Sequence, residues 1–91
     1  MQHNNSEKAK LFLKILGQEI KEQRIKLNKS QRLLADEYDC QKSMISRIES
    51  AVNEAKILYL YTICEALNIK LSDLIKSVEN KLPKDFSLIE K

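Results

Sequence analysis

The chain has 91 residues, enough for one domain with one small core. Its formal net charge of +3 permits a polyanionic partner but does not demand one. One Gly, one Pro and no Trp argue against a fold with many tight turns, and therefore against an all-β protein. Long helices joined by short polar turns fit this composition better.

The residues that serve as metal ligands or nucleophiles are few. Cys40 and Cys64 match no metal or redox spacing, and the one histidine, His3, lies in a polar leader. We therefore expect no metal, no cofactor, and reduced thiols in a cytoplasmic protein. No apolar run is long enough for a membrane span or a signal peptide. An enzyme is disfavoured, because there is no Gly-rich phosphate loop and the adjacent acids Asp36 and Glu37 are typical of a solvated surface.

The first predicted helix follows the polar leader and runs from about Ser6 to Leu27. One face of this helix recurs at steps of three and four residues, at Leu13, Leu16, Ile20, Arg24 and Leu27. Gly17 lies inside this pattern and should weaken the helix by about 1 kcal/mol relative to Ala. A polar stretch, residues 28–30, then ends the helix, and its Ser30 is a good N-cap for the next one.

Two short helices are predicted next, over residues 31–38 and 42–50, with a tight turn at Asp39 and Cys40 between them. A connecting segment, residues 51–55, leads to a fourth helix over residues 56–67.

The fifth predicted helix starts at a Ser72 cap and ends before Pro83. The sequence therefore predicts an all-α, compact five-helix domain with a helical N-terminal extension and a short C-terminal tail. We divide it into residues 1–10 (leader and start of the first helix), 11–79 (the domain) and 80–91 (the tail).

The third predicted helix has two contrasting faces. Its apolar arc is formed mainly by Met44, Ile45 and Ile48. The opposite arc carries two cations, three hydroxyls and no carboxylate: Lys42, Ser43, Ser46, Arg47 and Ser50. Such a face is often only a solvated surface, but it also suits a helix in the major groove, where Arg and Lys donate to guanine O6 and N7.

The start of the second predicted helix favours the second interpretation. Lys29, Gln31 and Arg32 lie there, and helix N-termini bind phosphate through free backbone N–H groups and the helix dipole. The acids Asp36, Glu37 and Asp39 lie toward the other end of that helix, away from the groove.

Several of these residues together resemble a known family. The motifs Ser30-Gln31, Leu34-Ala35 and Ile45-Ser46-Arg47-Ile48-Glu49 are similar to the Cro and phage-repressor (XRE-type) helix-turn-helix regulators, and the likeness extends over about residues 16–75. It implies a sequence-specific DNA-binding transcriptional regulator, a dimeric repressor that reads an inverted repeat. Activation through contact with the polymerase is a second mode of regulation.

The resemblance also implies residue roles. Contacts with base edges or adjacent phosphates are expected from Lys42, Ser43, Ser46 and Arg47, and Arg47 is the first candidate for a bidentate base contact. Phosphate contacts are implied for Gln31 and Asn53, and Lys29 and Arg32 are further candidates because they lie at the helix N-terminus. A structural ion pair is expected between Arg24 and Glu49.

Four positions depart from the family pattern. Asp39 replaces a Gly in the turn, where a positive φ is expected, and Gln41 replaces the customary Ser or Thr cap of the third helix. Ala51 and Ala55 replace a Gly and a Pro, so the loop after the third helix is expected to differ.

Apolar residues outside the core stripes have two possible explanations. Packing against the N-terminal extension is one, and a homodimer interface is the other. For the dimer the candidates are Leu58, Tyr59, Tyr61, Ile75 and Val78. An alternative function is an antitoxin-like module that binds a protein partner through the apolar residues of the tail, Phe86, Leu88 and Ile89.

Overall fold

Five helices and no strand make up the residues that the computed structural model describes, 6–52 and 54–89. The helices are α1 (Ser6–Lys26), α2 (Gln31–Glu37), α3 (Lys42–Glu49), α4 (Ile57–Ala66) and α5 (Leu71–Lys81). The predicted all-α five-helix fold is confirmed, and the helices begin and end within one residue of their predicted positions, except at the start of α5, where the N-cap is Lys70 and not Ser72. The predicted leader, residues 1–5, lies outside the described residues.

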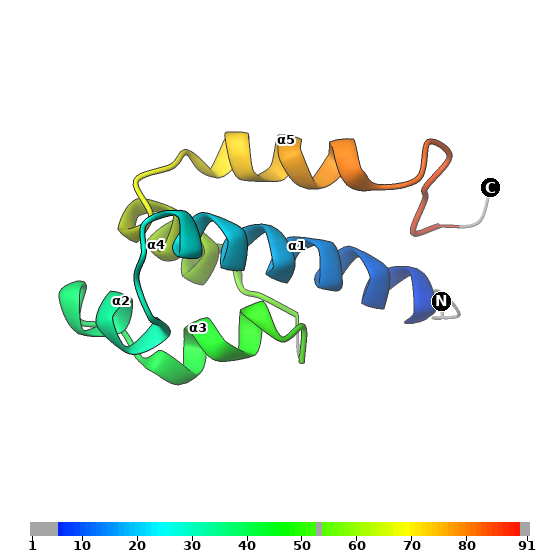
Figure 1. Cartoon of the computed structure of the whole chain (residues 1–91). Helices are drawn as coiled ribbons and strands as arrows, with labels where there is room; N and C mark the ends of the chain where they lie inside the picture. The colour runs from blue at the N-terminus through cyan, green and yellow to red at the C-terminus, as the bar shows by residue number, and fades with distance from the viewer. Residues whose placement is uncertain (1–5, 53, 90–91) are drawn as a thin grey trace.

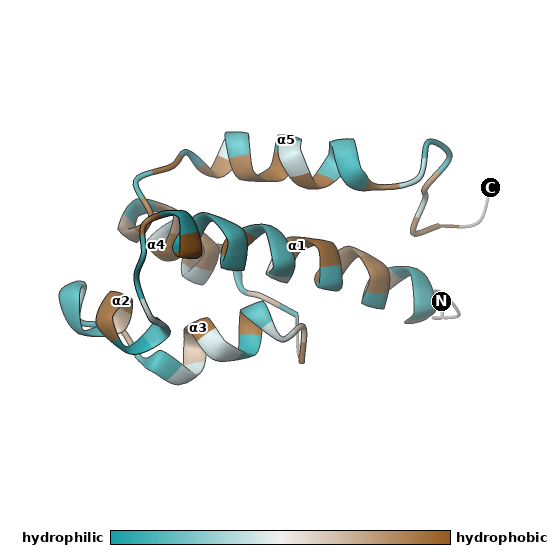
Figure 2. Ribbon diagram, in the orientation of Figure 1, coloured by the Kyte–Doolittle hydropathy of each residue, from teal (hydrophilic) through white to brown (hydrophobic). Residues whose placement is uncertain are grey.

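The long helix α1 forms the centre of the molecule. It packs against α3 on one side and against α5 on the other, while α2 packs on α3 and α4 on α5 (Figure 1). Hydropathy colouring shows the apolar residues of α5 on the side that faces α1 (Figure 2). The core takes side chains from all five helices, and its largest fully buried members are Ile20, Leu34, Ile45, Ile63, Val78 and Cys64.

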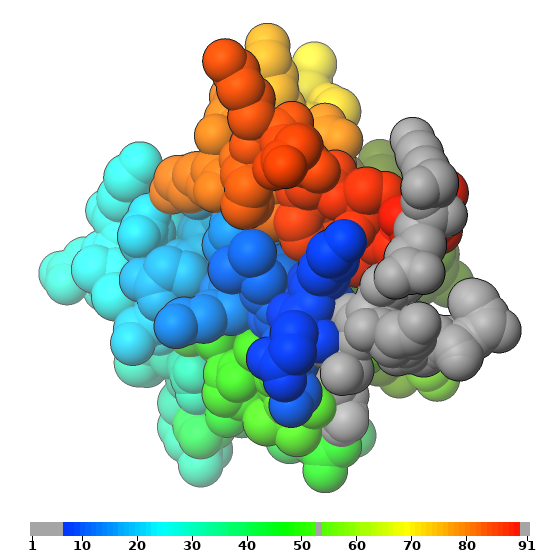
Figure 3. All heavy atoms as spheres, turned by 90° about the vertical axis from the view of Figure 1, so that its right-hand side faces the viewer, coloured from blue at the N-terminus to red at the C-terminus, as the bar shows by residue number. Residues whose placement is uncertain are grey.

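The N-terminal half of α1 is covered by the C-terminal segment. The rings of Phe12 and Phe86 lie 6.3 Å apart between centroids, and Leu82 and Ile75 also pack against the core. Lys81 on α5 also bonds the buried carboxylate of Glu19 on α1, at 2.5 Å. Viewed from that end, the start of α1 and the C-terminal segment form one continuous surface (Figure 3).

Local residue chemistry explains the start of α2 but not that of α5. The Ser30 hydroxyl accepts a hydrogen bond from the Leu33 N–H at 3.0 Å, so the predicted cap of α2 is confirmed. The Ser72 cap is wrong, because α5 begins at Leu71 and its N-cap is Lys70, which makes no side-chain capping bond. Leu71 packs against the core, and this contact favours a helix that begins at Leu71, one residue before Ser72.

Two expected exposures also need correction. Leu27 lies just beyond the end of α1 and is exposed, although the periodicity places it on the buried face. Val78 is fully buried, so its assignment to a dimer interface is wrong. The N-terminal extension of α1 lies beside α5, and this packing accounts for the burial of Val78.

Candidate nucleic-acid interface

Helices α2 and α3 form a bihelical unit around a tight turn. Asp39 has a φ of 54°, the left-handed conformation expected where the family has Gly, and Cys40 N–H then bonds the Ala35 carbonyl at 3.0 Å. Ala35 is buried and small, so α2 can lie close to α3. Gln41 is the N-cap of α3 and makes no side-chain capping bond.

Helix α3 separates its side chains as the sequence predicts. Ile45 and Ile48 are buried in the core and Met44 is half-buried beneath the helix. The opposite face reaches solvent: Lys42, Ser43, Arg47 and Ser50 are exposed, and Ser46 is half-buried. This outer face carries two cations and three hydroxyls, so it is rich in hydrogen-bond donors.

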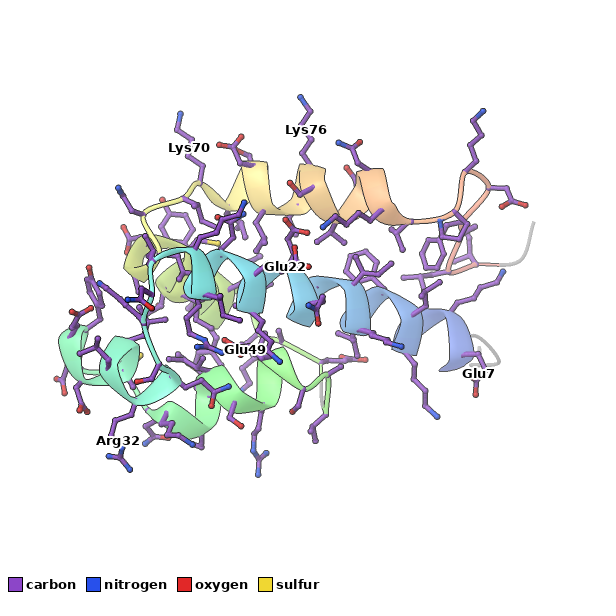
Figure 4. The ribbon with its side chains drawn as sticks, viewed as in Figure 1. Glu7, Glu22, Arg32, Glu49, Lys70 and Lys76 are labelled. Atoms are coloured by element: carbon purple, nitrogen blue, oxygen red, sulfur yellow. The ribbon has the colours of Figure 1, made fainter. Side chains whose placement is uncertain are left out.

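The one carboxylate of α3 turns away from that face. The side chain of Glu49 is only 4% exposed and lies between α1 and α3 (Figure 4). Arg24 on α1 donates to it twice, from Nε to Oε2 at 2.7 Å and from Nη2 to Oε1 at 2.9 Å. These hydrogen bonds raise the pKa of Arg24. The outer face of α3 is therefore free of negative charge from its own helix.

Glu49 also accepts a third hydrogen bond, which the sequence does not predict. Gln31, the first residue of α2, donates from Nε2 to Glu49 Oε1 at 3.0 Å. Arg24 Nη1 donates to the backbone carbonyl of Lys29 at 2.7 Å. One arginine and one glutamate thus connect α1, the α1–α2 loop, the start of α2 and the end of α3.

The candidate phosphate contacts differ in their surroundings. Arg32 is exposed and points away from the body of the molecule (Figure 4). Lys29 bonds Glu37 at 2.6 Å, which raises the pKa of Lys29, and it lies 5.9 Å from the centre of the Tyr38 ring. Glu37 is therefore closer to the basic residues at the start of α2 than the sequence suggests. Asn53 lies outside the described residues.

Helix α4 exposes an unusual amount of apolar surface. Ile57, Leu58 and Tyr61 are each more than half exposed, and Leu58 reaches 75%. Tyr59 is also exposed and lines open grooves between α3 and α4 beside Arg47. Of the two α5 residues predicted for a dimer face, Ile75 is half-buried against the core and Val78 is inaccessible.

Neither a metal-ligand cluster nor a membrane-spanning helix occurs within the described part of the chain. No three of its His, Cys, Asp and Glu residues come together as metal ligands, and no helix there has the length and apolar character needed to cross a membrane. Cys40 and Cys64 are free thiols. Burial raises the pKa of Cys64 to about 11, so this thiol is protonated and unreactive at neutral pH.

A five-helix domain with a capped, tightly turned α2–α3 unit and a cationic outer face on α3 defines the helix-turn-helix class of DNA-binding domains. A family model described as helix-turn-helix matches residues 20–74, more than half of the chain. The chain therefore belongs to this family, in its XRE type, a family of DNA-binding transcription regulators.

The comparison with solved structures supports the same fold. The chain is similar to the crystal structure of the clp gene regulator ClgR from C. glutamicum, with a TM-score of 0.71 and 19% identity. The similarity covers 81% of this chain and 96% of that chain. A comparison with curated proteins finds no match.

Proposed function

We propose that the chain is a dimeric transcriptional repressor that reads an inverted repeat by inserting α3 into the major groove. The observation that carries this proposal is the outer face of α3, where Lys42, Ser43 and Arg47 are exposed and Glu49 is turned inward. A helix with a donor-rich outer face and an apolar inner face anchored to a core is suited to base readout.

Each exposed group has a proposed role. Arg47 makes the bidentate base contact and Lys42 the second one, while Ser43 and Ser46 contact bases or adjacent phosphates. Gln31 and Arg32 at the start of α2 hold the phosphate backbone, and Lys29 joins them when it exchanges Glu37 for a phosphate. Asn53 is proposed as a further phosphate contact.

The dimer is proposed to form through α4. Leu58 and Tyr61 are three positions apart on this helix, both are exposed, and neither has a place in the core. Two copies of α3 must lie about 34 Å apart, one helical turn of DNA, to read two half-sites, and the proposed two-fold axis through α4 has to provide this spacing. Bound in this way at a promoter, the dimer would block the polymerase and so repress transcription.

Selection from a random DNA pool tests sequence reading and dimer symmetry together. The full chain should enrich duplexes that contain two inverted half-sites one helical turn apart. Arg47→Ala, selected in parallel, should lose preference at one base pair of each half-site. If the parent enriches no sequence, the proposed function is wrong, and enrichment of a lone half-site would remove the dimer from it.

Protein binding through the tail is a second candidate function. The observation that favours it is the exposure of Leu88 and Ile89, which extend past the Phe86 contact with α1. A Leu88→Ser, Ile89→Ser double variant keeps Phe86 in place. If it retains DNA affinity and full repression, the tail has no part in regulation, whereas loss of repression with intact DNA affinity would favour a protein partner.

A further inference from the structure

Glu49 holds the side chain of Gln31 as well as that of Arg24, and the two bonds share one oxygen atom, Oε1. We propose that Glu49 is a positioning residue for DNA binding, which fixes the Gln31 amide in the orientation that donates to a backbone phosphate. This inference rests on the proposed function, specifically on Gln31 as a phosphate contact.

The Gln31 amide has enough N–H groups to bond Glu49 and a phosphate at the same time. A glutamine side-chain nitrogen carries two hydrogens, and the 3.0 Å bond to Glu49 uses one of them. The second hydrogen points away from the first because the amide group is planar. With the nitrogen fixed by Glu49, the second N–H is presented in one direction from the start of α2.

The charge of Glu49 is compensated at the same place. A carboxylate close to DNA phosphates would ordinarily repel them, but Arg24 donates to both of its oxygens, at 2.7 Å and 2.9 Å. The pair is nearly buried, with 10% of the Arg24 side chain and 4% of the Glu49 side chain exposed. The carboxylate can therefore orient Gln31 without weakening the attraction for phosphate.

Arg24 also fixes the position of the neighbouring α1–α2 loop. Its Nη1 holds the Lys29 carbonyl at 2.7 Å, and Lys29 is followed by Ser30, the residue that caps α2. The start of α2 is thus fixed through both its backbone and its first side chain. A side chain that is already ordered loses less rotational freedom on binding, which is worth roughly 2- to 10-fold in affinity.

A thermodynamic cycle on DNA affinity tests this inference. The four proteins are the parent, Gln31→Ala, the pair replacement Arg24→Met with Glu49→Met, and the combination of all three changes. The pair replacement is chosen because apolar residues in place of a buried ion pair are often neutral or stabilising, whereas removing one partner is not. The probe is a labelled mixed-sequence duplex at low salt, because phosphate contacts do not require an operator.

We expect Gln31→Ala and the pair replacement each to weaken binding several-fold, and the combination to be no weaker than Gln31→Ala alone, because the pair has no amide to orient once Gln31 is removed. If the effects of Gln31→Ala and of the pair replacement on affinity multiply in full, the inference is wrong, since the ion pair would then act on stability or on other contacts. Unchanged affinity of Gln31→Ala would also overturn it. Arg32→Ala is the matched control on the same helix, and its effect should multiply with that of the pair replacement.

A measurement on the unmodified protein covers the case in which the pair replacement does not fold. The Gln31 amide proton that bonds Glu49 should appear downfield of the usual NMR range for glutamine side-chain amides in the free protein, and the other proton should move when the mixed-sequence duplex is added. Both protons at the chemical shifts of a solvent-exposed glutamine amide, with neither moved by the duplex, would overturn the inference. Failure of the parent to select any sequence would instead refute the proposed function, so the two failures are distinguishable.

Discussion

Gly17 lies directly against the end of α3, where a Cβ added to it would meet the carbonyl oxygen of Glu49 at 2.6 Å and that of Ile48 at 2.5 Å. Backbone atoms cannot move aside as a flexible side chain can. The one glycine of the chain therefore allows α1 and α3 to approach closely, and the Arg24–Glu49 pair lies two turns further along the same contact.

Gly17→Ala should destabilise the protein although Ala is the better helix former. Helix propensity predicts a gain of about 1 kcal/mol, but the overpacked contact should cost about 3 kcal/mol, for a net loss of about 2 kcal/mol. Denaturant unfolding monitored by circular dichroism measures this difference. Lys21→Ala, on an exposed position of α1, is the control and should change stability by less than about 0.5 kcal/mol. A more stable Gly17→Ala variant would show that the two helices do not touch at this point.

Arg24→Ala should be more damaging still. Among the described residues it leaves the buried Glu49 carboxylate with Gln31 as its one side-chain donor, and unpaired buried charges cost about 3–5 kcal/mol. The midpoint of denaturant unfolding should fall accordingly, and the combined Arg24→Met, Glu49→Met replacement should recover most of the loss. An unchanged midpoint in Arg24→Ala would mean that the ion pair contributes nothing in solution.

The sequence predicts the helices well because their signals are local. Apolar residues at steps of three and four, the Ser30 cap and the acceptable left-handed residue Asp39 all act within one turn of the chain. Ser72 fails as a cap because a tertiary contact of Leu71 decides where α5 begins. Local preference and tertiary packing compete at helix ends, and the packing dominates here.

The features that sequence reasoning misses connect residues far apart in the chain. Gln31 and Glu49 are 18 positions apart, and nothing in either segment signals their bond. The close approach at Gly17 likewise depends on where α3 ends. Val78 could be placed in the core only once α1 was known to extend alongside α5. A surplus of apolar residues predicts a contact, but it does not say whether the partner is the same chain.

Arg47→Ala should weaken binding to the selected operator by about 1–3 kcal/mol and relax specificity at one base pair of each half-site. Fluorescence anisotropy with the operator and with single-base variants measures both effects. Lys76→Ala is the control, because Lys76 lies on the opposite side of the molecule from α3 (Figure 4). Operator affinity equal to that of the parent would remove Arg47 from the interface.

Leu58→Glu should abolish the proposed dimer without unfolding the chain. The side chain is 75% exposed in the single chain, so a carboxylate there has little effect on the core but would be buried in the proposed dimer. Sedimentation velocity at tens of micromolar, with and without operator DNA, distinguishes the two states. Lys76→Glu makes a similar change away from α4 and should remain dimeric. A monomeric parent under both conditions would contradict the α4 interface.

The buried thiol of Cys64 should make stability fall at alkaline pH. In the unfolded chain this thiol ionises near its usual pKa of 9.0, whereas in the fold burial raises the pKa to about 11. Between these values the unfolded state binds fewer protons than the folded state, so unfolding becomes easier as pH rises, by about 3 kcal/mol in total. Below pH 9 there is no such effect.

Comparison with Cys64→Ala isolates the contribution of this thiol, because tyrosines and lysines titrate alike in both proteins. Under reducing conditions the stability advantage of the parent over the variant should be constant up to about pH 8 and should shrink toward pH 11. An advantage that does not change with pH would place the thiol in contact with water.

The packing of Phe86 on Phe12 brings the first turn of α1 and the last described residues to the same end of the molecule (Figure 1). A fluorophore, a surface tether or a fused protein attached through either end would therefore project from that end, beyond the start of α1 and away from the α2–α3 turn. Immobilised or labelled forms of the protein should consequently report on DNA without obstructing it.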